Sequence, residues 1–128
     1  MKLSRGNIVL CKVPMPSSEL KEFKLRPALI VSKDLNNKRL DDVIIAICTS
    51  NISRNQEPTQ YLIEGEEIAQ AGIKVPSVIK CESILTISKS MIVKILGALS
   101  ENGIHKVNHC LKDALELEWN NLFTSDFS

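Results

Sequence analysis

Apolar positions along the chain fall into short runs that polar segments separate, a pattern typical of β-strands joined by loops. The expected strands are 7–13, 26–32, 42–50, 59–63, 77–88 and 90–100. The last run fits a strand or a helix, and its β-branched residues and Gly97 favour a strand. Because 42–50 is apolar almost throughout, we expect this strand to be central.

One amphipathic helix is expected after the last strand. Ser100 is a residue type that favours the N-cap of a helix. The apolar residues beyond it recur at helical spacing, namely Ile104, Val107, Leu111, Ala114 and Leu115. This periodicity predicts a helix over about residues 101–118. Polar loops are expected at 14–23, 33–41 and 51–58, and one helical turn within 65–76 ends at Gly72.

These elements predict a mainly β fold with a C-terminal α-helix. Several short strands and one terminal helix suit a small SH3-like β-barrel or a curled antiparallel sheet with the helix packed alongside. A doubly wound α/β fold would need alternating helices, and the pattern lacks them. The length of 128 residues fits one domain, which we place at 1–119, with 120–128 as a flexible tail.

Charge and cysteine usage narrow the class further. Residues 101–128 hold five acidic and two basic side chains, whereas the first hundred residues hold 10 acidic and 14 basic ones. A mildly basic body is compatible with an anionic ligand. The four cysteines are dispersed and the two histidines lack partners at metal-site spacing, so we expect free thiols and no metal. No membrane span or signal peptide is evident, which favours the cytoplasm.

Three polar clusters mark the ends of apolar strands. Arg26 follows Lys24 and precedes Pro27, Thr49 and Ser50 close the 42–50 run, and Lys80 and Glu82 flank Cys81. Two of these clusters also have a purely structural interpretation. Thr49 and Ser50 are common turn residues, whereas Lys80 and Glu82, which alternation places on one face, form a reasonable ion pair. Neither a glycine-rich phosphate loop nor a Gly-x-Ser-x-Gly elbow is present.

Taken in order, several motifs resemble the MazF/PemK (Kid) family of toxin endoribonucleases from type II toxin–antitoxin systems. They are "RGNIVLCKVP", "KLRPALIVS", "IAICTS", "AGIKVPSVIKCESILTIS" and "ILGALSENGIHKVNHCLKDALEL". The resemblance runs from about residue 5 to about 117 and implies a PemK-type barrel. Asn7 stands where the family usually has an acidic residue. Lys80-Cys81-Glu82 stands where the PemK branch has Arg-Cys-Asp, so the charges match in sign but the residue types differ.

The resemblance assigns roles to individual residues. Arg26 matches the family's active-site arginine and Thr49 its active-site threonine or serine. Glu82 is the carboxylate at the position of the catalytic aspartate and Lys80 the cation at that of the second arginine. We expect contacts to RNA from Lys24, Ser50, Arg54 and Ser77.

The family activity implied is metal-independent cleavage of single-stranded RNA, in which the RNA's own 2′-OH attacks the adjacent phosphodiester. A fixed guanidinium suits the dianionic phosphorane, because it offers a planar and always charged fork. Glu82 would take the 2′-OH proton, Lys80 or Arg26 would serve the leaving oxygen, and Thr49 would bind a phosphate oxygen. An arginine is a poor acid, which favours an electrostatic role for Arg26.

The resemblance also implies partners, namely mRNA, a cognate antitoxin and a second copy of the chain. Trp119 and Phe123 lie at or beyond the helix end, where a dimer seam, an antitoxin or the barrel itself would cover them. Two alternatives share the fold: a CcdB-like toxin that binds DNA gyrase, and a catalytically inactive member that persists as a binding protein. The Arg-Pro and Thr-Ser pairing favours the ribonuclease.

Overall fold

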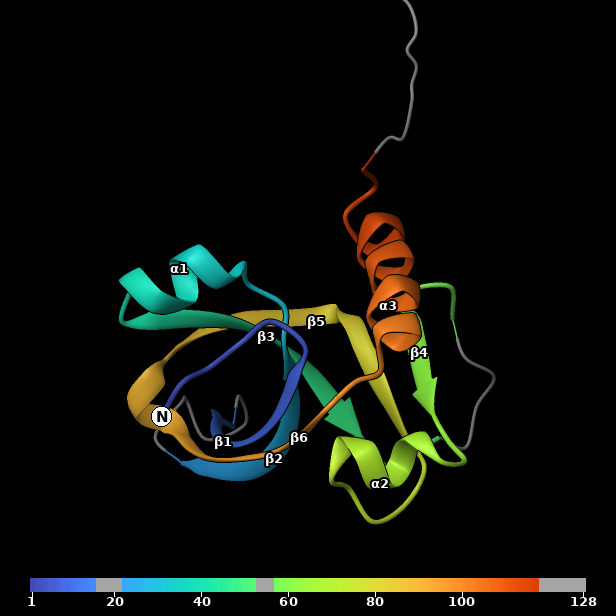
Figure 1. The fold of residues 1–128 in the computed structure, drawn as a ribbon, viewed down its shortest axis with the longest axis horizontal. Coiled ribbons are helices and arrows are strands. Elements are labelled where there is room, and N and C mark those ends of the chain that lie inside the picture. The colour runs from blue at the N-terminus through green and yellow to red at the C-terminus, as the bar shows by residue number, and fades with distance from the viewer. Residues whose placement is uncertain (16–21, 53–56, 118–128) are drawn as a thin grey trace, which may run out of the picture.

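The sheet contains six antiparallel strands in the computed structural model, which describes residues 1–15, 22–52 and 57–117. The strands are β1 (Asn7–Pro14), β2 (Phe23–Ile30), β3 (Asp42–Thr49), β4 (Gln60–Ile63), β5 (Ser77–Ser88) and β6 (Ile92–Ala98). Their order is β4-β5-β3-β2-β1-β6, so β3 is interior, as its apolar composition predicted. The sheet curls without closing (Figure 1), which confirms the predicted mainly β fold.

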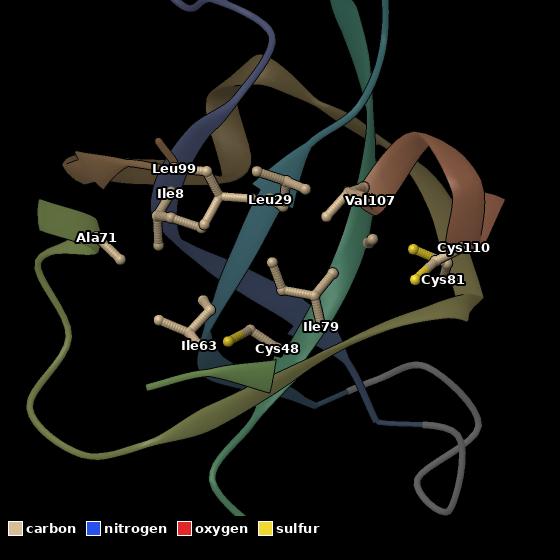
Figure 2. Packing of buried hydrophobic residues seen from close by; sticks show 11 residues of the cluster. Ile8, Leu29, Cys48, Ile63, Ala71, Ile79, Cys81, Leu99, Val107 and Cys110 are labelled. Carbon is tan, nitrogen blue, oxygen red and sulfur yellow. The ribbon is translucent and has the colours of Figure 1, made fainter. Parts of the chain in front are cut away.

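Two hydrophobic clusters pack on opposite faces of this sheet, because alternate residues of a strand point to opposite sides. One contains Val9, Ala28 and Ile45, and the other contains Ile8, Leu29 and Ala46. The second cluster extends to β4 and to the helices, as Figure 2 shows for Ile63, Ala71 and Val107. The second cluster includes helical residues such as Ala71, Val107 and Cys110, whereas the first consists of residues from the strands and the segments beside them.

The terminal helix α3 spans Glu101–Ala114 and packs on β4 and β5. Ser100 is its N-cap, and its hydroxyl accepts a hydrogen bond of 2.9 Å from the backbone N–H of Gly103, as expected. The helix ends four residues earlier than predicted, because Glu116 adopts a positive φ of 55°. Leu115, which we placed on the apolar face, is therefore half exposed beyond the helix end.

Two shorter α-helices and a 3₁₀ helix, η2 (Lys89–Met91), complete the fold. The turn expected within 65–76 is α2 (Glu67–Ala71), and Gly72 ends it in the left-handed conformation at a φ of 76°. At 33–41, where only a polar turn was expected, the chain forms the helix α1 (Asp34–Arg39). The buried side chain of Asn37 stabilises α1 by hydrogen bonds with the hydroxyl and the carbonyl group of Ser32.

All four cysteines are free thiols, as predicted, and all four are buried. Burial raises the pKa of Cys11 and Cys48 to about 11 and that of Cys81 to about 12. In Figure 2 the sulfur atoms of Cys81 and Cys110 lie next to each other between β5 and α3. The thiols therefore contribute to packing in their neutral form.

Candidate active site

Pro27 lies inside β2 rather than at its first position, because β2 begins at Phe23 and not at residue 26. Alternate residues of an antiparallel strand direct their N–H groups to the same neighbour. The N–H of Val31 donates to Ile44 at the start of β3, so position 27 also faces β3. The pairing of β2 with β3 covers Ala28–Ile30 only. Pro27, which has no N–H, therefore stands where this pairing ends.

Arg26 and Thr49 lie just beyond the end of this pairing, Arg26 on β2 and Thr49 on β3. Ala28 pairs with Ile47, so the same register carried two residues further would set Arg26 opposite Thr49. Both lie on the face of the first hydrophobic cluster, since they alternate with Ala28 and Ile47 respectively. Two residues that are 23 positions apart in the sequence thus lie at the adjoining ends of β2 and β3.

The guanidinium of Arg26 is half buried and available for an anion. Among the described residues, no hydrogen bond or ion pair occupies its side chain; its carbonyl group accepts a contact from the Cys11 thiol at 3.6 Å. The Thr49 hydroxyl oxygen accepts the backbone N–H of Asn51 at 3.1 Å. That bond leaves its O–H free to donate, as binding a phosphate oxygen requires.

Lys80 adjoins this pair on the next strand. Ile47 pairs with Lys80, so these two side chains share a face with Thr49, which alternates with Ile47. Lys80 therefore lies diagonally across from Thr49, whose own partner is Val78. β4 continues the row of Ile47 and Lys80, because Gln60 pairs with Lys80. The register of β3 with β5 shifts between Ala46 and Ile47, and the resulting bulge in β5 contains Glu82. Bulges redirect side chains and are frequent beside active sites.

Glu82 is bound by two side chains from the start of β4. The Thr59 hydroxyl donates to Oε1 at 2.9 Å, and the Gln60 amide donates to Oε2 at 2.7 Å. Partial burial acts to raise the pKa of Glu82. Hydrogen bonds from Gln60, from its own backbone N–H and from Thr59, together with the charge of Lys80, outweigh that effect and lower the pKa below its ordinary value. Glu82 is therefore an anion at neutral pH.

The remaining predicted contacts do not all face this site. Lys24 and Ser50 are exposed at the adjoining ends of β2 and β3. Ser77 is buried, and its hydroxyl donates to the Val75 carbonyl group at 3.1 Å. It alternates with Ile79 and so lies on the face opposite Lys80, which corrects its assignment as an RNA contact. Arg54 lies outside the described residues, as do Trp119 and Phe123.

Sequence reasoning missed Thr59 and Gln60, the two residues that bind Glu82. Their signal in the sequence is a pair of polar side chains that opens a short apolar strand, which is also the pattern of an ordinary loop end. The pairing of β4 with β5 alone places them beside Glu82.

A second polar cluster joins α2 to the start of α3. The Glu67 carboxylate accepts hydrogen bonds from the Tyr61 hydroxyl and from the backbone N–H and hydroxyl of Ser100. Burial, followed by the hydrogen bond to Glu67, raises the pKa of Tyr61 beyond its usual range. This cluster caps a helix and holds two elements together. Among the described residues, no cluster of three His, Cys, Asp or Glu side chains is arranged to hold a metal ion.

Known proteins resemble this chain over most of its length. A family model described as the PemK-like, MazF-like toxin of type II toxin–antitoxin systems matches residues 4–115. Proteins named endoribonuclease MazF are 30% identical over 116 residues in Staphylococcus saprophyticus and 31% identical over 116 residues in Staphylococcus epidermidis. Each alignment covers 90% of this chain and 92% of the relative.

Solved structures share the fold. A mycobacterial endoribonuclease in complex with its cognate antitoxin superposes with a TM-score of 0.74 at 23% identity, over 92% of this chain and 99% of that one. A MazE–MazF complex from Deinococcus radiodurans gives a TM-score of 0.71 at 16% identity, over 92% of this chain and 99% of that one. No helix in the described part of the chain is long and apolar enough to cross a membrane.

Proposed function

Because the chain belongs to the PemK-like, MazF-like family of toxins and is an endoribonuclease of that family, we propose that it cleaves single-stranded mRNA in the cytoplasm at specific sequences and without a metal ion. The observation that carries this proposal is the placement of Arg26, Thr49 and Lys80 on one face of the sheet, with Glu82 beside them. This set offers cations, a hydroxyl donor and a carboxylate, which suffice for transesterification of RNA.

In the proposed reaction the carboxylate of Glu82 takes the proton of the 2′-OH. The O2′ atom attacks the adjacent phosphorus, and the bond from phosphorus to O5′ breaks as the Lys80 ammonium gives a proton to O5′. The products are a 2′,3′-cyclic phosphate and a free 5′-hydroxyl. Arg26 and Thr49 stabilise the phosphorane oxygens, because the guanidinium fork and the hydroxyl donate hydrogen bonds where negative charge develops.

Incubation of the purified protein with single-stranded RNA in EDTA tests this function. We expect discrete fragments that end in 2′,3′-cyclic phosphate. The same preparation is assayed for inhibition of DNA gyrase supercoiling. Intact RNA together with gyrase inhibition would establish the CcdB-like alternative instead, and RNA binding without either activity would establish an inactive member.

We further propose that two copies of the chain form the active toxin and share an RNA groove. The described surface carries exposed apolar side chains on β2 and β6, among them Phe23, Leu25 and Val93, whose burial between subunits would favour association. Sedimentation at micromolar concentration should therefore give a dimer. A monomer at that concentration would contradict the shared groove.

A cognate antitoxin is the second proposed protein partner. We propose that an acidic segment of it covers Arg26 and Lys80 and inhibits by excluding RNA, in the manner of a disordered chain that orders on binding. Increasing RNA should then relieve the inhibition. An antitoxin that inhibits cleavage equally at all RNA concentrations would contradict this mode.

A further inference from the structure

We propose that Thr59 and Gln60 are positioning residues that hold the Glu82 carboxylate in the orientation in which it accepts the 2′-OH proton. The proposal rests on the ribonuclease function proposed above and extends it to residues outside the motifs. Thr59 precedes β4 directly and Gln60 is its first residue, so both are fixed to the strand that pairs with the Glu82 strand.

The two donor residues, Thr59 and Gln60, are themselves held in place by hydrogen bonds. The Thr59 carbonyl group accepts the backbone N–H of Cys81 at 3.0 Å, which ties it to the residue before Glu82. The Gln60 carbonyl oxygen Oε1 accepts the backbone N–H of Glu57 at 3.3 Å. Because Oε1 is used in this way, the amide nitrogen of Gln60 points toward Glu82. The two donors are thus oriented before any substrate binds.

The two hydrogen bonds fix the plane of the carboxylate but do not exhaust its acceptor capacity. Each oxygen of Glu82 accepts one side-chain bond, one from Thr59 and the other from Gln60. An ionised carboxylate has about four lone-pair sites in all. A free site therefore remains for the proton of a 2′-OH. Since proton transfer depends on alignment, an orientation fixed in advance favours the reaction.

The titratable groups around Glu82 come from two elements. Lys80 and Cys81 lie on β5, and Cys110 lies on α3. Burial keeps both thiols neutral by raising their pKa, so Lys80 is the charged neighbour. The donors on Thr59 and Gln60 act in the same direction as Lys80 and lower the pKa of Glu82. The two donors and Lys80 therefore keep Glu82 ionised, and able to act as a base, down to a lower pH.

If the two side-chain bonds to Glu82 had only a structural role, they would be redundant with the backbone pairing of the strands. The backbone of β4 already pairs with β5 from Gln60 to Ile63. The side-chain bonds lie at the exposed surface, where water competes for each partner and the net stabilisation is small. Their distinct consequence is the fixed direction and the lowered pKa of one carboxylate.

The test compares Gln60→Met and Thr59→Val, which remove the donors at nearly constant size, with Thr59→Ser, which keeps a hydroxyl. We expect kcat to fall roughly tenfold to a hundredfold in the first two variants with little change in KM, and Thr59→Ser to retain most activity. The acid limb of the pH profile should move to higher pH, because loss of a donor raises the pKa of Glu82. Thr86→Val on β5 and Gln70→Met on α2, both exposed, should match the parent.

A carboxyl 13C titration of Glu82 by NMR distinguishes failure of the positioning role from failure of the proposed ribonuclease function. We expect the midpoint to rise in Gln60→Met and Thr59→Val whether or not RNA is present. If Glu82→Gln slows cleavage while Gln60→Met and Thr59→Val change neither the rate nor the acid limb, the positioning role is overturned and the ribonuclease function stands. If the parent protein cleaves no RNA, both fail, and a raised midpoint then establishes the two contacts as structural.

Discussion

Replacing Arg26 by alanine is expected to lower the cleavage rate about 10² to 10³-fold, because it removes a charged donor to the phosphorane. The fold should survive, since Arg26 is only half buried and its guanidinium bonds to none of the described residues. Arg26→Lys should also be impaired, because an ammonium group lacks the planar fork that binds two phosphate oxygens. Rates are measured under single-turnover conditions on one RNA, with circular dichroism to verify folding.

Arg39→Ala is a matched control for this change. Arg39 is exposed on α1, and its guanidinium donates to Asn36 one turn away, at 3.3 Å. Arg39→Ala removes the same positive charge as Arg26→Ala, so a loss of overall electrostatic attraction for RNA appears in both variants. Equal rates for Arg26→Ala and Arg39→Ala would contradict the role assigned to Arg26.

Glu82→Gln is expected to slow cleavage by roughly 10² or more, because the amide cannot take the 2′-OH proton. RNA affinity should stay the same or rise, since a negative charge is lost near a polyanion. Glu82→Asp keeps the charge but shortens the side chain by about 1.5 Å, one C–C bond. That change weakens the contacts with Thr59 and Gln60, so we expect an intermediate rate.

The control for Glu82 is Glu64→Gln, which removes an exposed carboxylate directly after β4. Binding of a non-cleavable RNA with 2′-deoxy sugars is measured alongside the rate in each variant. A Glu82→Gln protein that cleaves as fast as Glu64→Gln would show that the carboxylate has a structural role with Lys80, Thr59 and Gln60.

The strands followed from the sequence because their apolar runs are buried by the sheet in which they lie. β1 and β3 match the predicted bounds to within a residue, and the cap at Ser100 is a local interaction that residue type alone specifies. The helix α1 was missed because the residues of this segment by themselves favour a turn. Asn37 of α1 bonds with Ser32, and the Ser32 hydroxyl accepts the backbone N–H of Ile44 on β3, a contact that only the folded sheet provides.

The candidate site was predictable to a different degree at each residue. The Arg-Pro and Thr-Ser motifs pointed to Arg26 and Thr49, and the register explains why β2 can carry a proline next to Arg26, where its pairing with β3 ends. Ser77 was misassigned because a shift of one position along β5 reverses the face, and motif matching does not resolve faces. Thr59 and Gln60 were invisible because their role depends on strand pairing across the chain.

The central claim is that the side chains at this site make the RNA's own 2′-OH the nucleophile. After the cut position in an RNA oligonucleotide has been mapped, a second oligonucleotide is made with a single 2′-deoxy sugar on the 5′ side of that bond. The account predicts unchanged binding and no cleavage at the modified bond, whether EDTA or Mg²⁺ is present. Cleavage there at the parent rate would mean that water is the nucleophile, and would contradict the assigned roles of Glu82 and Arg26.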